Sequence, residues 1–114
     1  LYDAFTINTI LFLEDLGYCA KGEGKDLVKN GYIAPGGGLK VNTNGGGLSC
    51  VHPGMYGLFV TIEAVRQIRA AAGEEEGERG EGGWVPNTKL TLAHGNGGVL
   101  SSQVTTIWGH PDSL

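Results

Sequence analysis

The sequence is short of the features that mark several large classes of protein. It contains no apolar run near the length of about 18 residues that a membrane-spanning helix needs, and no segment patterned like a signal peptide. Its two cysteines, Cys19 and Cys50, fit no metal-ligand spacing and are too few for a disulfide framework. Basic residues are scarce as well, since 8 Lys and Arg face 12 Asp and Glu for a net charge of −4. We therefore expect no membrane span, no bound metal, no nucleic-acid partner, and a cytoplasmic protein with reduced thiols.

Glycine, by contrast, is abundant. The 114 residues include 21 glycines, while hydrophobic residues make up 40%, so the chain has enough apolar surface for one modest core. The glycines gather at 36–38, 45–47, 73–83 and 95–98, which predicts tight turns and close backbone approaches at those places. The chain starts with Leu1 rather than Met and opens at once on a predicted helix, so we expect a fragment or a processed chain.

Hydrophobic periodicity predicts an α/β domain that ends in a β-hairpin. Asp3 is the expected N-cap of the first helix, and Asn96-Gly97 is a strong signal for the hairpin turn. The expected elements are helices from Asp3 to about Leu16, from 25 to 29 and from 55 to 72, with strands at 39–43, 88–94 and 99–108.

The third of these helices is the most strongly patterned. Its apolar residues recur at helical spacing, and we expect them to form its core face: Met55, Leu58, Phe59, Ile62, Val65 and Ile68. Gly73 is expected to end the helix. Residues 74–83 then form an acidic, glycine-rich loop that we expect to be exposed and flexible.

A His-Pro pair connects the glycine turn at 45–47 to this helix. Proline is tolerated in the first helical turn, where the unpaired backbone N–H groups create a partial positive charge. That charge disfavours an imidazolium ion, so His52 should be neutral and able to accept a proton or to donate a hydrogen bond to an oxyanion. The alternative is that His52 is only a capping residue.

Several motifs, taken in order, resemble the C-terminal half of thiolases, and more narrowly the sterol-carrier or lipid-transfer branch of that family. The resemblance covers essentially the whole chain. It is carried by residues 2–5 (Tyr-Asp-Ala-Phe), 13–17 (Leu-Glu-Asp-Leu-Gly), 21–24 (Lys-Gly-Glu-Gly), 42–46 (Asn-Thr-Asn-Gly-Gly), 52–53 (His-Pro), 63–69 (Glu-Ala-Val-Arg-Gln-Ile-Arg) and 94–98 (His-Gly-Asn-Gly-Gly).

This resemblance implies a layered α/β thiolase fold, with helices on a mixed sheet, of which residues 1–114 form the C-terminal part. It implies acyl transfer or carbon–carbon cleavage on coenzyme A thioesters, as in acetyl-CoA acetyltransferases, with the thioester as substrate and no bound cofactor. The nucleophilic cysteine of the family lies in the N-terminal half, so this chain by itself is expected to lack the covalent step.

The resemblance also implies roles for particular residues. His52 matches the histidine that activates the nucleophilic thiol and helps to hold an oxyanion. Tyr2 falls where the lipid-transfer branch has an oxyanion-stabilising histidine, and a phenol donates a hydrogen bond but is a poor base near neutral pH. His94 falls, within about one residue, at the position of the second catalytic cysteine, and Ala4 stands where the lipid-transfer branch has its alternative acid/base cysteine. Both cysteine positions are therefore empty, which puts ordinary Claisen thiolysis in doubt.

An alternative reaction suits these departures. Some proteins of this fold resemble aldolases that split hydroxyacyl-CoA side chains with tyrosines, and such a step needs a base and an enolate stabiliser but no thiol. His52 or Tyr2 is the expected base or acid, with the backbone N–H groups of Asn96 and Gly97 as donors. Tyr56 is a candidate for the pocket lining, although packing is its more ordinary role.

The apolar faces of the first and third predicted helices exceed what a thin hairpin can cover, so we expect a partner. The candidates are the N-terminal thiolase half, a second thiolase chain in a homo-oligomer, and a small acyl-CoA-binding subunit of the kind that associates with part of the family. A non-catalytic structural subunit remains the alternative to an enzyme.

Overall fold

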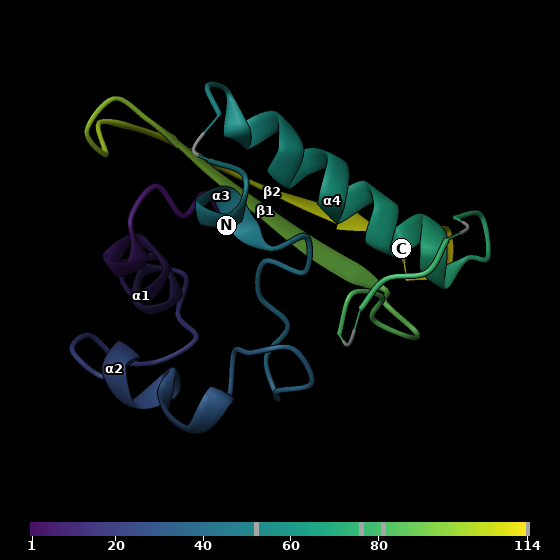
Figure 1. Cartoon of the computed structure of the whole chain (residues 1–114), viewed down its shortest axis with the longest axis horizontal. Coiled ribbons are helices and arrows are strands. Elements are labelled where there is room, and N and C mark those ends of the chain that lie inside the picture. Colours follow the sequence, from purple (N-terminus) through teal and green to yellow (C-terminus); the bar gives the residue numbers. More distant parts are fainter. Residues whose placement is uncertain (52, 76, 81, 114) are drawn as a thin grey trace.

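The computed structural model describes residues 1–51, 53–75, 77–80 and 82–113. Figure 1 shows α4 running alongside a β-hairpin, with α1 and α2 close together to one side. The predicted α/β organisation with a C-terminal hairpin is confirmed. None of the helices in these ranges is long and apolar enough to cross a membrane. The elements are, in order, α1 (Thr6–Asp15), α2 (Gly24–Leu27), the 3₁₀ turn η1 (Lys29–Gly31), α3 (Gly46–Ser49), α4 (Tyr56–Ala71), β1 (Leu90–Gly97), β2 (Ser102–Gly109) and the 3₁₀ turn η2 (Pro111–Ser113).

The core lies between α4 and β1. Tyr56, Val60 and Ala64 lie one turn apart on one side of α4, and they form a buried cluster with Ala93 of β1. Thr91, two residues before Ala93 and so on the same face of the strand, donates from Oγ1 to the carbonyl of Ala64 at 3.1 Å. These contacts fix the helix along the length of the strand.

The opposite face of the hairpin carries His94 and meets α1. Successive side chains of a strand point to opposite faces, so His94 points away from the side on which Ala93 packs. The ring of Phe12 meets the imidazole edge-on, with ring centroids 4.4 Å apart. Phe12 and its neighbour Leu13 are both buried. The two faces of β1 are thus covered by different helices.

The first helix begins at Thr6, and the prediction that Asp3 caps it is wrong. The carboxylate of Asp3 accepts hydrogen bonds from the backbone amides of Gly47 and Leu48, at 2.5 and 3.4 Å, in the first turn of α3. The start of α1 is stabilised instead by Asn8, whose Oδ1 accepts a hydrogen bond from the backbone amide of Phe5 at 2.9 Å. A carboxylate satisfies the free amides of a helix start wherever they lie in the chain, and here those amides belong to a distant helix.

The predicted strand at 39–43 is not formed. The sheet of the described residues contains two strands, β1 and β2, which pair antiparallel, so this segment has no strand beside it. Its last residue, Thr43, bonds through its side chain to α4. The sheet is therefore an antiparallel pair among the described residues rather than a mixed sheet.

The hairpin turn lies two residues beyond the place predicted for it. Gly97 pairs with Ser102 at the end of the ladder, so Asn96-Gly97 belongs to the strand and residues 98–101 form the loop. Gly98 and Leu100 provide the positive φ angles there, +59° and +56°. A four-residue loop with its own left-handed positions replaces the two-residue turn.

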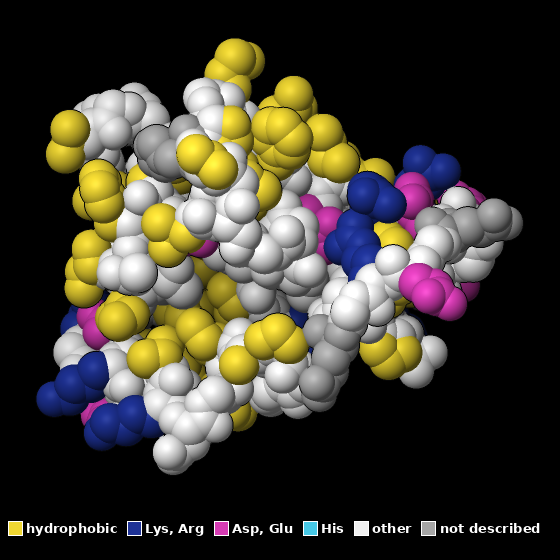
Figure 2. All heavy atoms as spheres, in the orientation of Figure 1, with side chains coloured by type: hydrophobic (Ala, Val, Ile, Leu, Met, Phe, Trp, Pro, Cys, Tyr) yellow, Lys and Arg dark blue, Asp and Glu magenta, His cyan; other side chains and the backbone are white. Residues whose placement is uncertain are grey.

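Helix α4 is confirmed, as is its end at Gly73, but of the predicted core face only Ile68 is fully buried. Leu58, Phe59 and Ile62 are 58%, 47% and 45% exposed, and Figure 2 shows hydrophobic side chains gathered along the outer side of this helix. Glu63 and Gln67 are buried in their place. The buried residues of α4 are thus a mixture of apolar and polar side chains, with Tyr56, Val60, Ala64 and Ile68 beside this polar pair.

The acidic loop at 74–83 is exposed only in part, contrary to expectation. Glu75 is half-buried and forms ion pairs at 3.3 Å with both Arg66 and Arg69 of α4. Arg79 is half-buried as well, and Gly83 is buried. The basic residues of α4 draw the described part of this loop back onto the helix.

Gly46 tests the contact between Asp3 and α3. Its φ is +76°, and a Cβ there would collide with the Asp3 carboxylate. We predict that Gly46→Ala lowers the free energy of unfolding by roughly 1–3 kcal/mol, the range for a non-glycine residue forced into a left-handed conformation. Gly57→Ala is the control, because that glycine has an ordinary φ and nothing within 4 Å of its Cβ position. Denaturant unfolding of the purified protein measures both, and equal stabilities would contradict the prediction.

Candidate functional site

Asn44 joins the glycine turn to the start of α4. Its Oδ1 accepts hydrogen bonds from the backbone amide of Gly46 at 3.0 Å and from the Tyr56 hydroxyl at 3.1 Å. An amide oxygen can accept two bonds, so both are satisfied at once. The asparagine therefore sets the position of the turn relative to the helix that follows it.

Tyr56 is the most buried aromatic residue of this region, with 1% of its surface exposed. Its ring meets Tyr2 edge-on at 5.4 Å and stacks on Phe59 at 5.8 Å. Burial, only partly opposed by the hydrogen bond to Asn44, raises the pKa of Tyr56 to about 12. The phenol therefore stays neutral and keeps donating to Asn44 at any physiological pH, as a packing role requires.

Tyr2 is brought beside β1 by its backbone. Its amide donates to the carbonyl of His94 at 2.9 Å, so the N-terminal segment runs along the edge of β1. Its half-buried ring rests on Tyr56. The structure thus brings the rings of Tyr2 and Tyr56 together, whereas only the backbone carbonyl of His94 meets Tyr2, because the His94 side chain lies on the opposite face of β1.

His94 is 7% exposed, and both of its ring nitrogens have partners on β2. Nδ1 lies 2.8 Å from Thr105 Oγ1, and Nε2 lies 2.9 Å from Gln103 Oε1. An amide oxygen only accepts, so Nε2 carries a proton and donates to Gln103, while Nδ1 shares a hydrogen bond with the threonine hydroxyl. The histidine is held between two strand side chains on one face of the hairpin.

The remaining predicted residues have different outcomes. His52 lies outside the described residues, so its role stays a prediction. Asn96 and Gly97 form the end of β1, opposite Gln103 and Ser102. The Oδ1 atom of Asn96 is buried and has no hydrogen-bond partner among the described residues. The predicted use of the Asn96 and Gly97 amides as oxyanion donors stays a prediction too.

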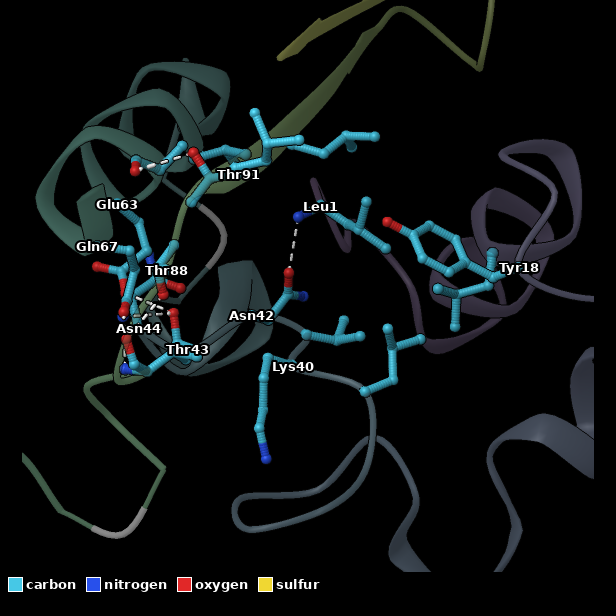
Figure 3. Close-up of a pocket in the computed structure, with 18 of the residues that line it drawn as sticks. Leu1, Tyr18, Lys40, Asn42, Thr43, Asn44, Glu63, Gln67, Thr88 and Thr91 are labelled. Carbon is cyan, nitrogen blue, oxygen red and sulfur yellow. Dashed lines mark hydrogen bonds between the residues drawn. The ribbon is translucent and has the colours of Figure 1, made fainter. Parts of the chain in front are cut away.

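A cavity of about 420 Å³ opens between the 38–44 segment, α4 and β1. Figure 3 shows Leu1 and Tyr18 on one side of it, and Thr43, Glu63 and Gln67 on the other. The described residues hold no cluster of three or more His, Cys, Asp or Glu side chains that could bind a metal ion. The lining mixes apolar and hydrogen-bonding side chains, as small organic ligands require.

Sequence reasoning missed the polar residues on the inner side of α4. Glu63 and Gln67 are buried together with the half-buried Thr43, and Arg79 reaches them from the acidic loop. The spacing of Glu63 and Gln67 could have indicated this pair, because residues four apart lie on one face of a helix. Their face was not expected to be buried, because the large apolar residues that were expected to form the core face of α4 lie mainly on another side of the helix.

Ionisation of Tyr56 opposes folding, because its pKa rises from 10.0 to about 12 in the folded protein. Its contribution to stability is complete below pH 10 and is lost as the pH rises toward 12. We predict that Tyr56→Phe is less stable than wild type at neutral pH, by about 1 kcal/mol for the lost hydrogen bond, and that this gap closes toward the alkaline end. Urea unfolding at a series of pH values measures the gap. Tyr32→Phe, at an exposed tyrosine, should show no closing gap, and a pH-independent gap for Tyr56→Phe would refute the prediction.

Similarity to known proteins indicates the family of this chain. A sequence model described as thiolase C-terminal domain-like matches residues 1–110. The chain is 44% identical over 72 residues to a 17-hydroxy-3-oxo-4-pregnene-20-carboxyl-CoA lyase of Mycobacterium tuberculosis, covering 63% of this chain and 18% of that protein. It is 35% identical over 116 residues to human sterol carrier protein 2, covering 99% of this chain and 20% of that protein. It is 39% identical over 88 residues to an acetyl-CoA acetyltransferase of Methanothermobacter thermautotrophicus, covering 76% and 23%.

The chain spans about a fifth of the length of these relatives. No solved structure gives a significant match. The family match covers nearly the whole chain, including the 42–46 turn, α4 and the hairpin that hold the residues described above. The resemblance read from the ordered motifs is thereby confirmed, and the chain belongs to the thiolase C-terminal domain-like family.

Proposed function

We propose that this chain is the C-terminal part of an enzyme that forms or cleaves a carbon–carbon bond in a coenzyme A thioester. The observation that carries the proposal is the packing of Tyr2 on Tyr56, whose hydroxyl donates to Asn44 in the turn that precedes the His-Pro pair in the sequence. Two of its relatives, the lyase and the acetyltransferase, are named for CoA compounds. The remainder of the longer protein would supply the nucleophilic cysteine if the reaction uses one.

The residues take different roles in this proposal. His52 is the base, as its match to the His-Pro histidine of the family suggests. A helix start gives no further support for a neutral imidazole, because α4 begins only at Tyr56 and Pro53 lies outside its first turn. Tyr2 is the hydrogen-bond donor to the thioester oxygen, and the backbone amides of Asn96 and Gly97 are further donors. The ring of Tyr56 packs against the ring of Tyr2 and holds it in place. The hydroxyl of Tyr56 is bound to Asn44, so Tyr56 is given no direct role toward the substrate. His94 positions Tyr2 through its carbonyl, because both of its ring nitrogens are occupied by β2.

Retro-aldol cleavage is the second candidate, and the chemistry of the thiols favours it. Ala4 and His94 occupy the positions at which the family has cysteines. Partial burial, together with the nearby carboxylates of Glu14 and Glu23, raises the pKa of the Cys19 thiol, which keeps it protonated and weakly nucleophilic. Cys50 is exposed beyond α3. In a retro-aldol step a base removes the hydroxyl proton, the adjacent carbon–carbon bond breaks, and the electron pair passes into the thioester as an enolate, which needs no thiol.

The exposed apolar stripe of α4 bears on partners. Leu58, Phe59 and Ile62 are large, apolar and about half exposed, which is typical of a surface that another body covers. We propose that the rest of the same protein covers it, and that a second copy or a small acyl-CoA-binding subunit adds to the assembly. A structural subunit without activity is what remains if no thioester is turned over.

Substitution of His52 tests its proposed role as the base. If it is the base, His52→Ala in the full-length protein lowers kcat by about 10²–10⁴-fold, the usual contribution of general acid–base catalysis. Thermal unfolding should show that the variant still folds. The assay uses acetoacetyl-CoA with free CoA, and a 3-hydroxyacyl-CoA without it. Near-normal turnover of the thioester that wild type accepts would remove His52 from the mechanism.

Loss of the Tyr2 hydroxyl and alkylation of the thiols distinguish retro-aldol cleavage from Claisen thiolysis. If the enzyme is an aldolase, Tyr2→Phe costs far more activity than alkylating every thiol, and cleavage proceeds without free CoA. Tyr32→Phe is the matched control, because Tyr32 is an exposed tyrosine outside the site. Stoichiometric consumption of free CoA, measured by thiol titration, together with inactivation by alkylation, would exclude the aldol reaction and leave Claisen thiolysis.

A further inference from the structure

Two polar residues on the inner side of α4 hold together segments that are far apart in the sequence. Glu63 and Gln67 are 9% and 4% exposed, and they lie one turn apart. The Oε1 atom of Glu63 accepts from the Thr43 hydroxyl at 2.5 Å and from Nη1 of Arg79 at 2.6 Å. Gln67 Nε2 lies 2.7 Å from the same carboxylate oxygen and 3.0 Å from Thr43 Oγ1. Figure 3 shows Thr43, Glu63 and Gln67 gathered at one wall of the cavity.

The amide of Gln67 is used at both ends. Its Nε2 also reaches the carbonyl of Gly83 at 2.6 Å, and its Oε1 accepts from the amide of Val85 at 3.0 Å. The donor end meets only oxygens and the acceptor end meets an N–H, so the orientation of the amide is determined. Gln67 therefore ties Thr43 to the segment at 83–85.

The charge in this network is balanced by the acidic loop. Burial acts to raise the pKa of Glu63, but the hydrogen bonds from Arg79, Gln67 and Thr43 outweigh it and hold that pKa below its usual value. The guanidinium of Arg79 also lies 3.8 Å from the centre of the Trp84 ring, which fixes its position. Glu63 is thus ionised at neutral pH, and the hydroxyl of Thr43 must donate to it while accepting from Gln67.

Thr43 stands directly before Asn44, the residue that bonds both Gly46 and Tyr56. We propose that Thr43 is a positioning residue, which uses Glu63 and Gln67 to fix the 42–46 turn against α4 and so, through Asn44 and Tyr56, sets the position of Tyr2. The proposal rests on the proposed function for its effect on catalysis. The placement of the turn itself does not depend on any activity.

Loss of the Thr43 hydroxyl should move the turn rather than unfold the domain. Glu63 keeps its bonds to Arg79 and Gln67, and Gln67 keeps its bonds to the 83–85 segment. What disappears is the link from this network to the 42–46 turn. An error of about 1 Å in a positioning element is enough to cost about 10²-fold in rate, even when substrate binding is little changed.

The test uses three variants of the full-length protein. Thr43→Val keeps the shape of the side chain without the hydroxyl, and Thr43→Ser keeps the hydroxyl. Thr61→Val is the matched control, because Thr61 lies in α4 and its hydroxyl donates within the helix, to Gly57 O at 3.1 Å. Two readouts are taken for each variant: kcat and KM on the thioester that wild type turns over, and hydrogen–deuterium exchange of the peptide that covers residues 42–50.

The proposal expects Thr43→Val to lose at least about tenfold in kcat with KM changed less than about twofold, and to exchange faster in the 42–50 peptide. Thr43→Ser should restore both, and Thr61→Val should alter neither. Normal kcat and normal exchange in Thr43→Val would overturn the proposal, as would equal losses in the serine variant or in the Thr61 control. If wild type turns over neither thioester, the proposed function fails, and the exchange data alone decide whether Thr43 holds the turn.

Discussion

The close approach of α4 to β1 is the constraint on which the other features of this chain depend. A Cβ on Gly95 would lie only 3.7 Å from the Cα of Gly57, so helix and strand backbones are nearly in contact at that level. Tyr56, Val60, Ala64 and Ala93 form the core that helix and strand share. The polar residues of the same helix face then lie at the margin of this contact, where they need partners from elsewhere in the chain.

Those partners come from the two glycine-rich segments, and this gives the glycines their purpose. The turn at 42–46 supplies Thr43 and Asn44, and the loop at 77–85 supplies Arg79 and the backbone of Gly83 and Val85. Both segments have to lie flat against a helix, which glycine permits at positions that a Cβ would obstruct. The residues around Tyr2 are held in place because the whole 42–48 segment is held, by α4 on one side and by Asp3 on the other.

Sequence reasoning recovered the elements whose cause is local and failed where the cause is tertiary. The extent of α4 and its end at Gly73 follow from propensity and from glycine chemistry, and both were predicted. The face that α4 buries was not, because apolar periodicity identifies a stripe but not the body that the stripe meets. Asp3 is a typical N-cap residue and stands just before the first helix, yet its carboxylate caps a helix more than 40 residues later. The contact between Tyr2 and Tyr56 was not predicted, since no periodicity connects residues so far apart.

The inverted polarity of α4 has a thermodynamic consequence. It buries the polar Glu63 and Gln67, while three of its large apolar side chains, Leu58, Phe59 and Ile62, lie outward. Much of the hydrophobic free energy encoded in this helix is therefore not released when the chain folds upon itself, but only when another surface meets it. Folding and association are then linked by mass action, as for any ligand that binds only the native state. A chain built in this way gains its full stability from its surroundings rather than from its own contacts.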